Sequence, residues 1–143
     1  MRTRSFATLG TLALLAAASA FGQQRLRADI PFEFNVAGTV LPAGNYEVTC
    51  TGGVVQVRSH ALNALSIANN ITGGSGESIQ PRLMFNKYGD KYFLAEVWSS
   101  PDSMNGAALL QSKAERETAR GNPRVARIAV PLRTGTITLA SLR

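Results

Sequence analysis

The chain has 143 residues with 15 basic and 9 acidic side chains, one histidine and one cysteine. A single cysteine excludes an internal disulfide framework, and a single histidine gives no support to a zinc site. The basic residues are scattered and do not form a stripe interleaved with aromatic residues, so the sequence does not indicate nucleic-acid binding. No motif predicts a catalytic centre, a bound metal or a cofactor.

The first segment of the chain is typical of a secretory signal peptide. Arg2 and Arg4 precede an apolar run from Phe6 to Ala18, and small residues follow this run. The run is shorter than the ~20 residues of a membrane-spanning helix. We therefore expect residues 1–22 to be removed and residues 23–143 to form one β-domain. This domain would be secreted or periplasmic, with no integral membrane span.

Short alternating apolar segments separated by Gly, Pro and Asn fill the first half of the mature chain and indicate strands. The expected strands cover residues 27–36, 45–51, 54–58 and 64–71. Pro31 interrupts the first of them, because proline cannot donate a ladder hydrogen bond. Residues 40–44 predict a turn, Gly52-Gly53 predicts a two-residue hairpin turn, and residues 72–78 predict a loop.

A second hairpin is the most apolar part of the mature chain. Its expected strands, 82–88 and 91–98, flank Gly89-Asp90, which suits a type II′ turn because glycine occupies the first central position. Both strands carry apolar residues on both faces, which predicts a hairpin covered on each side. We therefore place the core at Phe85, Phe93, Leu94 and Val97.

The last part of the chain predicts one helix and two strands. After a loop at 101–106, Ser112 and Glu115 have the spacing of a capping box, which opens a short helix over 112–120 that stops at Gly121-Asn122-Pro123. The last expected strands cover residues 125–132 and 136–139. About seven or eight short strands and one helix predict an all-β fold, either a single antiparallel β-sandwich or a small barrel.

Two segments carry a family resemblance. Ile30-Pro31-Phe32-Glu33-Phe34 leads to Leu41-Pro42-Ala43-Gly44-Asn45-Tyr46, and Leu83 to Trp98, centred on Tyr88-Gly89-Asp90-Lys91-Tyr92-Phe93-Leu94, precedes 112–117. In this order they resemble a family of small secreted β-rich proteins of unassigned function from soil acidobacteria. The resemblance extends to about residue 118 and implies export and a bacterial host, with no catalytic residues to transfer. Residues 41–46 alone also resemble the turn-to-strand element of prealbumin-like and Cna-B-like sandwich modules.

Cys50 and His60 are the first candidates for chemistry. Cys50 follows Tyr46 and Val48 at alternate positions, so we expect a buried, inert thiol on an apolar strand face. A nucleophile–base pair with His60 requires that strand pairing bring the two side chains together. Nothing else in the sequence is typical of a cysteine hydrolase.

Strand carboxylates and aromatic residues are the remaining candidates. A glycosidase needs two facing carboxyl groups, and Glu33, Glu47 and Glu96 all lie in expected strands. For Glu96, a cross-strand ion pair on a sheet face is the favoured interpretation. Tyr88, Tyr92 and Trp98 could form an aromatic binding surface for sugar or peptide, but for all three the favoured interpretation is a place in the core or belt of the hairpin. As binding residues the sequence offers Tyr92, Glu96 and Trp98.

The leading functional hypothesis is an exported, non-enzymatic β-domain that acts in binding, envelope structure or adhesion. Its expected partner is an envelope polysaccharide or protein, and the ligand is unknown. The alternative is a secreted hydrolase that acts on polysaccharide through strand carboxylates. An eight-stranded outer-membrane barrel is disfavoured, because the expected strands are shorter than the ~9–11 residues such barrels use.

Overall fold

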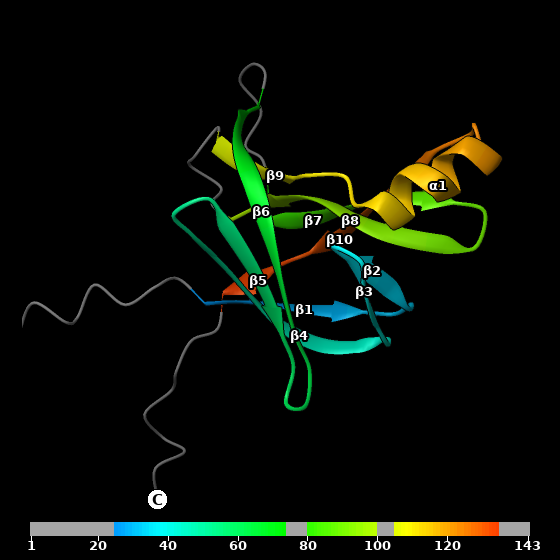
Figure 1. Cartoon of the computed structure of the whole chain (residues 1–143). Coiled ribbons are helices and arrows are strands. Elements are labelled where there is room, and N and C mark those ends of the chain that lie inside the picture. The colour runs from blue at the N-terminus through cyan, green and yellow to red at the C-terminus, as the bar shows by residue number, and fades with distance from the viewer. Residues whose placement is uncertain (1–24, 74–79, 100–104, 135–143) are drawn as a thin grey trace, which may run out of the picture.

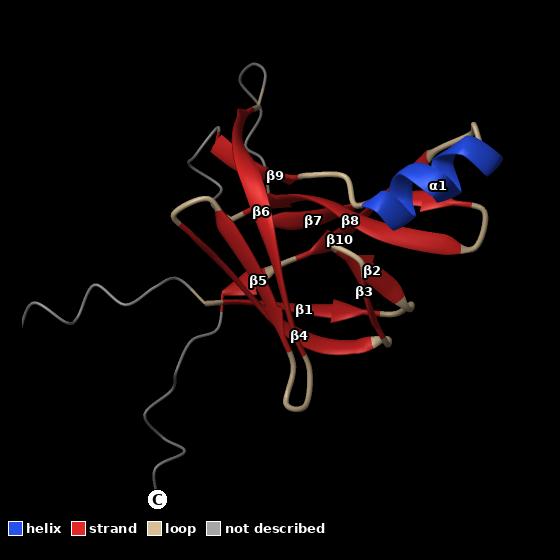
Figure 2. Cartoon of the chain, in the orientation of Figure 1, coloured by secondary structure: helices blue, strands red, loops and turns tan. Residues whose placement is uncertain are grey.

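The structure, a computed structural model, describes residues 25–73, 80–99 and 105–134 (Figure 1). These residues form eleven strands and one helix (Figure 2), which confirms the expected β-rich class. The first six strands are β1 (Leu26–Ile30), β2 (Phe34–Val36), β3 (Thr39–Leu41), β4 (Gly44–Thr51), β5 (Val54–Arg58) and β6 (Asn63–Thr72). The remaining elements are β7 (Arg82–Tyr88), β8 (Lys91–Trp98), β9 (Asn105–Leu109), α1 (Lys113–Gly121), β10 (Ala126–Pro131) and β11 (Arg133–Thr134).

The strands form one mixed sheet in the order β10-β7-β8-β9-β6-β5-β4-β1-β11, with β2 and β3 joined to it through β8. The pairing of β2 with β8 is parallel, and the neighbours along the main order pair antiparallel. Among the described residues the sheet does not close into a barrel, because β10 and β11 form its two ends. The first part of β6 pairs with β5 and its last part with β9. One half of the sheet thus contains β1, β4, β5, β11 and the first part of β6, and the other contains β2, β3, β7, β8, β9, β10 and the last part of β6. Strand β6 connects the two halves (Figure 1).

The strand count exceeds the expected seven or eight because four short strands lie outside the predicted segments or divide them. The predicted strand 27–36 splits into β1 and β2 around Pro31, as the missing donor requires. The turn predicted at 40–44 is wrong at its start, since Leu41 ends β3 and is fully buried. The β2–β3 turn lies instead at Ala37 and Gly38, which have φ of 50° and 90°. The predicted strand 136–139, the signal segment and most of loop 72–78 lie outside the described residues.

The two predicted glycine hairpins are confirmed. Gly52 and Gly53 both have positive φ, 58° and 78°, and join β4 to β5. Gly89 has φ of 60°, while Asp90 is not among the residues with positive φ, as a type II′ turn requires. Strands β7 and β8 have the predicted bounds, and their register shifts between Met84 and Phe85.

Strand β9 begins inside the loop expected at 101–106, at Asn105 and Gly106, and continues through residues 107–109, for which no element was expected. Residues 101–104 of that loop lie outside the described residues. The sequence of β9, Asn-Gly-Ala-Ala-Leu, has no β-branched residue, so propensity does not reveal it. A Cβ atom at Gly106 would lie 2.7 Å from Cε3 of Trp98. The absence of a side chain at Gly106 therefore lets β9 lie against the Trp98 ring.

Both halves of the sheet contribute to one apolar core. Phe34 contacts Tyr46 of one half and Phe85 of the other, with ring centroids 5.1 and 5.5 Å apart. Phe85, Leu94 and Val97 are buried in this cluster, as predicted. The fully buried side chains are Phe34, Phe85, Leu26, Ile30, Leu41, Leu83, Val36, Val48, Val55, Val57 and Val97.

The helix α1 lies beside the β7–β8 hairpin (Figure 2), on the face that carries Tyr88 and Phe93. Phe93 is 3 % exposed but does not belong to the main core, and its ring lies 5.8 Å from that of Tyr88. Glu115 on α1 is 4 % exposed and accepts hydrogen bonds from Tyr88 Oη and Asn86 Nδ2, each at 3.1 Å. The hairpin is therefore covered on both faces, as its sequence predicts.

The helix cap differs from the predicted capping box in one respect. The Glu115 amide donates to Ser112 Oγ at 3.1 Å, as expected. The Glu115 carboxylate does not return to the Ser112 amide but accepts from the sheet residues beneath the helix. The same residue thus serves the cap through its backbone and the helix–sheet contact through its side chain.

Candidate functional site

A partly enclosed pocket of about 290 Å³ lies between the β2–β3 hairpin, the start of β8 and α1. Its lining combines apolar side chains with two carboxylates, an amide and a lysine. These residues are Phe32, Glu33, Phe34, Asn35, Val40, Asp90, Lys91, Tyr92, Phe93, Ala114 and Thr118. An apolar cavity with a few polar groups at its rim is the usual form of a small-ligand site.

The aromatic wall of the pocket follows from the break at Pro31. The chain leaves β1 there, and Phe32 stacks on Tyr92 with centroids 3.8 Å apart and planes at 13°. Phe32 also contacts Phe85 edge-on, at 5.1 Å and 89°. Lys87 Nζ lies 5.3 Å from the centre of the Tyr92 ring, a favourable cation–π distance. The wall is therefore held by several contacts and is formed before any ligand arrives.

A second, more open hollow of about 710 Å³ adjoins the pocket. The two share four lining residues, Asp90, Lys91, Ala114 and Thr118. The second hollow is completed by Tyr88, Gly89, Glu117, Gly121 and Asn122. The two hollows thus continue into each other along the helix, and we call them together the α1 groove.

Hydrogen-bonding groups of both kinds line the α1 groove. Asp90 and Lys91, at the hairpin turn, are both exposed and present a carboxylate and an ammonium. Glu117 is 3.9 Å from Lys113 in an exposed ion pair, which constrains it little. Thr118 donates its hydroxyl proton to the Ala114 carbonyl at 2.8 Å, so its oxygen remains able to accept. The groove can therefore both donate to and accept from a neutral polar ligand.

Of the three binding residues predicted from the sequence, the structure brings two together. Trp98 Nε1 donates to Glu96 Oε2 at 2.9 Å, and Arg127 Nη2 lies 2.5 Å from Glu96 Oε1. The predicted cross-strand ion pair of Glu96 is confirmed. Trp98 is 6 % exposed and therefore offers no open ring face. Tyr92 opposes Lys87 on the other face of the hairpin and lines the α1 groove.

The prediction that Cys50 is buried is wrong, because its side chain is exposed. Tyr46 and Val48 on the same strand are buried, and so is Val55, the cross-strand partner of Cys50. The thiol is thus exposed beside the Gly52-Gly53 turn although its neighbours on that face are covered. Desolvation by its surroundings raises the pKa of the Cys50 thiol to about 11. A thiol with this pKa is almost wholly protonated at neutral pH and is a poor nucleophile.

The register also separates Cys50 from His60. His60 follows β5 at its far end, five residues beyond Val55, the cross-strand partner of Cys50. The strand from Val55 to Arg58, its last residue before His60, already spans about 10 Å at ~3.3 Å per residue. A nucleophile–base pair of these residues is therefore excluded in this fold.

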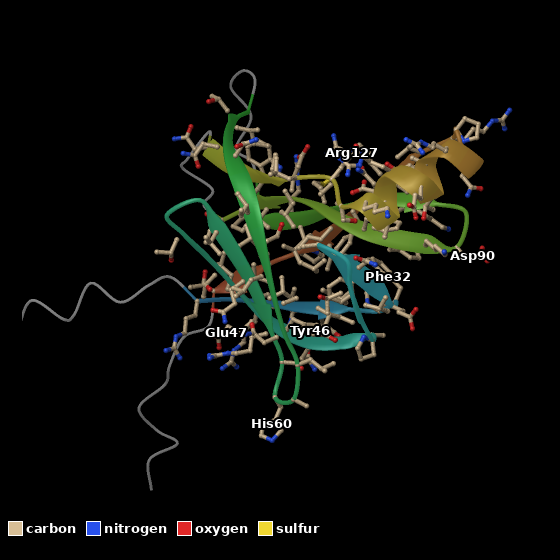
Figure 3. The ribbon with its side chains drawn as sticks, in the orientation of Figure 1. Phe32, Tyr46, Glu47, His60, Asp90 and Arg127 are labelled. Carbon is tan, nitrogen blue, oxygen red and sulfur yellow. The ribbon has the colours of Figure 1, made fainter. Side chains whose placement is uncertain are left out.

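The three predicted carboxylates lie at three separate places. Glu47 contacts Arg58 at 3.2 Å and Arg25 at 3.7 Å on the outer face of β4. Glu96 pairs with Arg127, and Glu33 lines the pocket. Figure 3 shows Glu47 and His60 far from Asp90, which lies at the tip of the β7–β8 hairpin. No two of the predicted glutamates face each other as a glycosidase pair requires.

Sequence reasoning missed most of the α1 groove. Phe32, Asp90 and Thr118 come from a strand break, a turn and a helix, and no spacing in the sequence connects them. The one usable signal in the sequence is Phe32, an aromatic residue directly after Pro31. A side chain at this position leaves the strand pairing and is free to line a pocket. Asp90 was visible only as a turn residue.

Within the described residues, no group of three or more His, Cys, Asp or Glu side chains is placed to hold a metal ion. The same residues contain no helix long and apolar enough to cross a membrane. Comparison with protein-family models, curated proteins and solved structures found no match to this chain.

Proposed function

We propose that this chain is an exported, non-enzymatic β-domain that binds a short stretch of envelope polysaccharide in the α1 groove. The observation that carries the proposal is the pocket itself. It is enclosed on one side by the stacked Phe32 and Tyr92 rings and bordered by Asp90 and Lys91. The basic head and short apolar run of residues 1–22 support export.

A sugar suits the chemistry of this groove better than a purely apolar ligand does. Each sugar ring has an apolar face and a rim of hydroxyl groups that both donate and accept. The pocket has about the volume of a single ring-sized ligand, and the adjoining hollow leaves room for further units of a chain. Carboxylate, ammonium and amide groups at one rim match the hydroxyl groups of such a ligand.

The scaffold that presents the groove is, in our proposal, a sandwich. The two halves of the sheet share one core, and the chain passes between them at β6 and again at Leu132, which separates β10 from β11. Strand β10 pairs with β7 in one half, and β11 pairs with β1 in the other. Crossing strands at both sides of a shared core support a sandwich with linked sheets over a closed barrel.

Titration calorimetry of the mature chain with oligosaccharides from bacterial envelope polysaccharide tests this function. We expect Asp90→Ala and Lys91→Ala each to weaken binding about tenfold or more, because hydrogen bonds to charged groups contribute ~1.5–3 kcal/mol. Thr51→Ala, on an exposed strand end away from the groove, is the matched control. Affinity that is the same for all three variants would contradict the proposed site.

A polysaccharide hydrolase is the second candidate, since Glu33 and Asp90 both line the pocket. Both carboxylates are exposed, whereas an acid and a base with separate roles need two different environments. We therefore expect no release of reducing ends from the oligosaccharides that bind. Turnover by the unmodified chain that disappears in Glu33→Gln and Asp90→Asn would favour the hydrolase.

A further inference from the structure

The outer face of β1, β4, β5 and β11 carries an unusual row of arginines. Arg133 opposes Arg27, Arg27 opposes Glu47, and Glu47 opposes Arg58. Residues directly opposite in a ladder lie on the same face of the sheet and about 5 Å apart. Three cations and one anion therefore follow one another across four neighbouring strands.

This row has more positive charge than its acidic partner can neutralise. Glu47 contacts Arg58 at 3.2 Å and Arg25 at 3.7 Å, so one carboxylate serves two guanidinium groups. The side chains of Arg27 and Arg133 take part in none of the ion pairs among the described residues. Like charges directly opposite each other destabilise a sheet. An external anion would relieve this repulsion.

Exposed aliphatic side chains continue the same face of the sheet. Val54 lies four residues before Arg58 on β5 and opposes Ile67 of β6. Leu65, two residues before Ile67, lies on that face as well. Val54 is 40 % exposed, Leu65 is 57 % exposed and Ile67 is 65 % exposed. We call this combination of the arginine row and the aliphatic residues the Arg27 face.

We propose that the Arg27 face binds the surface of a membrane that contains anionic lipids. Phosphate-bearing headgroups complement the two unpartnered arginines, and each arginine near such a surface contributes about fivefold to binding. The exposed aliphatic residues distinguish this ligand from a soluble polyanion, which would leave them in water. Lipid headgroups and the upper acyl chains cover both kinds of side chain.

This site is separate from the α1 groove and does not depend on the polysaccharide proposal. The Arg27 face belongs to β1, β4, β5, β6 and β11, whereas the α1 groove is built from β2, β3, β8, the β7–β8 turn and α1. Figure 3 shows Glu47 of the arginine row and Asp90 of the groove in separate parts of the molecule. One chain can therefore hold a membrane surface and a sugar at the same time.

Co-sedimentation of the mature chain with vesicles tests the proposal. We expect binding to phosphatidylcholine vesicles that contain phosphatidylglycerol and none to vesicles of phosphatidylcholine alone. The double variant Arg27→Gln/Arg133→Gln should bind about 25-fold more weakly at low salt. Arg116→Gln/Arg120→Gln on α1 changes the net charge equally and should bind as the unmodified chain does.

The double variant Leu65→Thr/Ile67→Thr separates a lipid surface from other anions. Weaker vesicle binding with unchanged arginines supports a contact that includes acyl chains. The proposal is overturned if anionic vesicles are not bound or if both arginine double variants bind equally well. It is also overturned if soluble polyglutamate is bound as tightly as vesicles and the Leu65/Ile67 variant is unaffected, because the partner is then an acidic polymer.

Discussion

Gly106→Ala is the most informative single change in this fold. A Cβ atom at residue 106 would lie 2.7 Å from Cε3 and 2.8 Å from Cδ2 of Trp98. Carbon atoms in good contact are about 3.5–4.0 Å apart, so the ring or strand β9 must move by about 1 Å. Trp98 is 6 % exposed and its Nε1 donates to Glu96 at 2.9 Å. Movement of the ring would therefore disturb both its burial and this hydrogen bond.

Two terms set the size of the expected loss. Overpacking a filled site costs about 1–3 kcal/mol, and weakening the Trp98–Glu96 hydrogen bond adds about 0.5–1.5 kcal/mol. We expect a loss of ~2–4 kcal/mol in the free energy of unfolding. With a urea slope of about 1–3 kcal/mol per molar, the unfolding midpoint should fall by ~1 M or more.

Urea unfolding followed by tryptophan fluorescence measures this loss. Trp98 is the only tryptophan in the chain, so the signal reports on the affected site itself. Gly121→Ala is the matched control, because a Cβ atom there meets nothing within 4 Å. The reasoning is refuted if Gly106→Ala and Gly121→Ala have the same midpoint as the unmodified chain.

Three further predictions concern the core, the helix and the thiol. Leu94→Ala should lose ~2–5 kcal/mol of stability in urea, whereas Val125→Ala, at a side chain 47 % exposed, should lose little, and equal midpoints would disprove the core assignment. Glu115→Ala should cost about 1–3 kcal/mol more than Glu115→Gln in thermal unfolding, because Tyr88 and Asn86 lose their shared acceptor, and equal losses would mean that the acceptor is unimportant. Cys50 should react with a maleimide in the folded protein, and because only the thiolate reacts, the reaction rate should rise about tenfold per pH unit up to a pH of about 11. A rate that levels off near pH 8 would contradict the raised pKa of Cys50.

The same pKa shifts predict how stability depends on pH. Burial raises the pKa of Tyr88, with Glu115 as a second cause, and desolvation raises that of Cys50. A group whose pKa is higher in the folded state stabilises the fold below its unfolded pKa. This contribution is lost as the pH rises through the folded value. Stability should therefore fall above pH 9, where unfolded Cys50 begins to ionise, and further above pH 10 for Tyr88.

The fold could be predicted where local chemistry decides the structure. Gly52-Gly53 and Gly89-Asp90 mark hairpins because only a few residues accept the backbone angles of such turns. Strand β9 could not be predicted, because its Gly106 is required by the ring of Trp98 and not by any local preference. The predicted burial of Cys50 is wrong for a related reason: alternation assigns a side chain to a face, but whether anything covers that one position depends on the whole fold, and Cys50 is exposed although its partner Val55 is buried.

The candidate site was less accessible to sequence reasoning than the fold. Glu96 was placed correctly, because an ionised side chain between apolar strand residues needs a neighbouring cation, and Arg127 provides it. The α1 groove combines Phe32, Lys91 and Thr118, which are distant in the sequence and brought together by the parallel contact of β2 with β8 and by the position of α1. Pairings of this kind are set by long-range packing, which periodicity does not report.

NMR titration of the mature, isotope-labelled chain with a neutral envelope oligosaccharide is the most direct test of the central claim. Binding in the α1 groove predicts amide shift changes at Asn35, Lys91 and Thr118, which border the pocket on three different elements. The amides of Arg27 and Arg58, on the Arg27 face, should not move. Shift changes confined to the Arg27 face, or none at saturating oligosaccharide, would contradict the assignment of the α1 groove as the polysaccharide site.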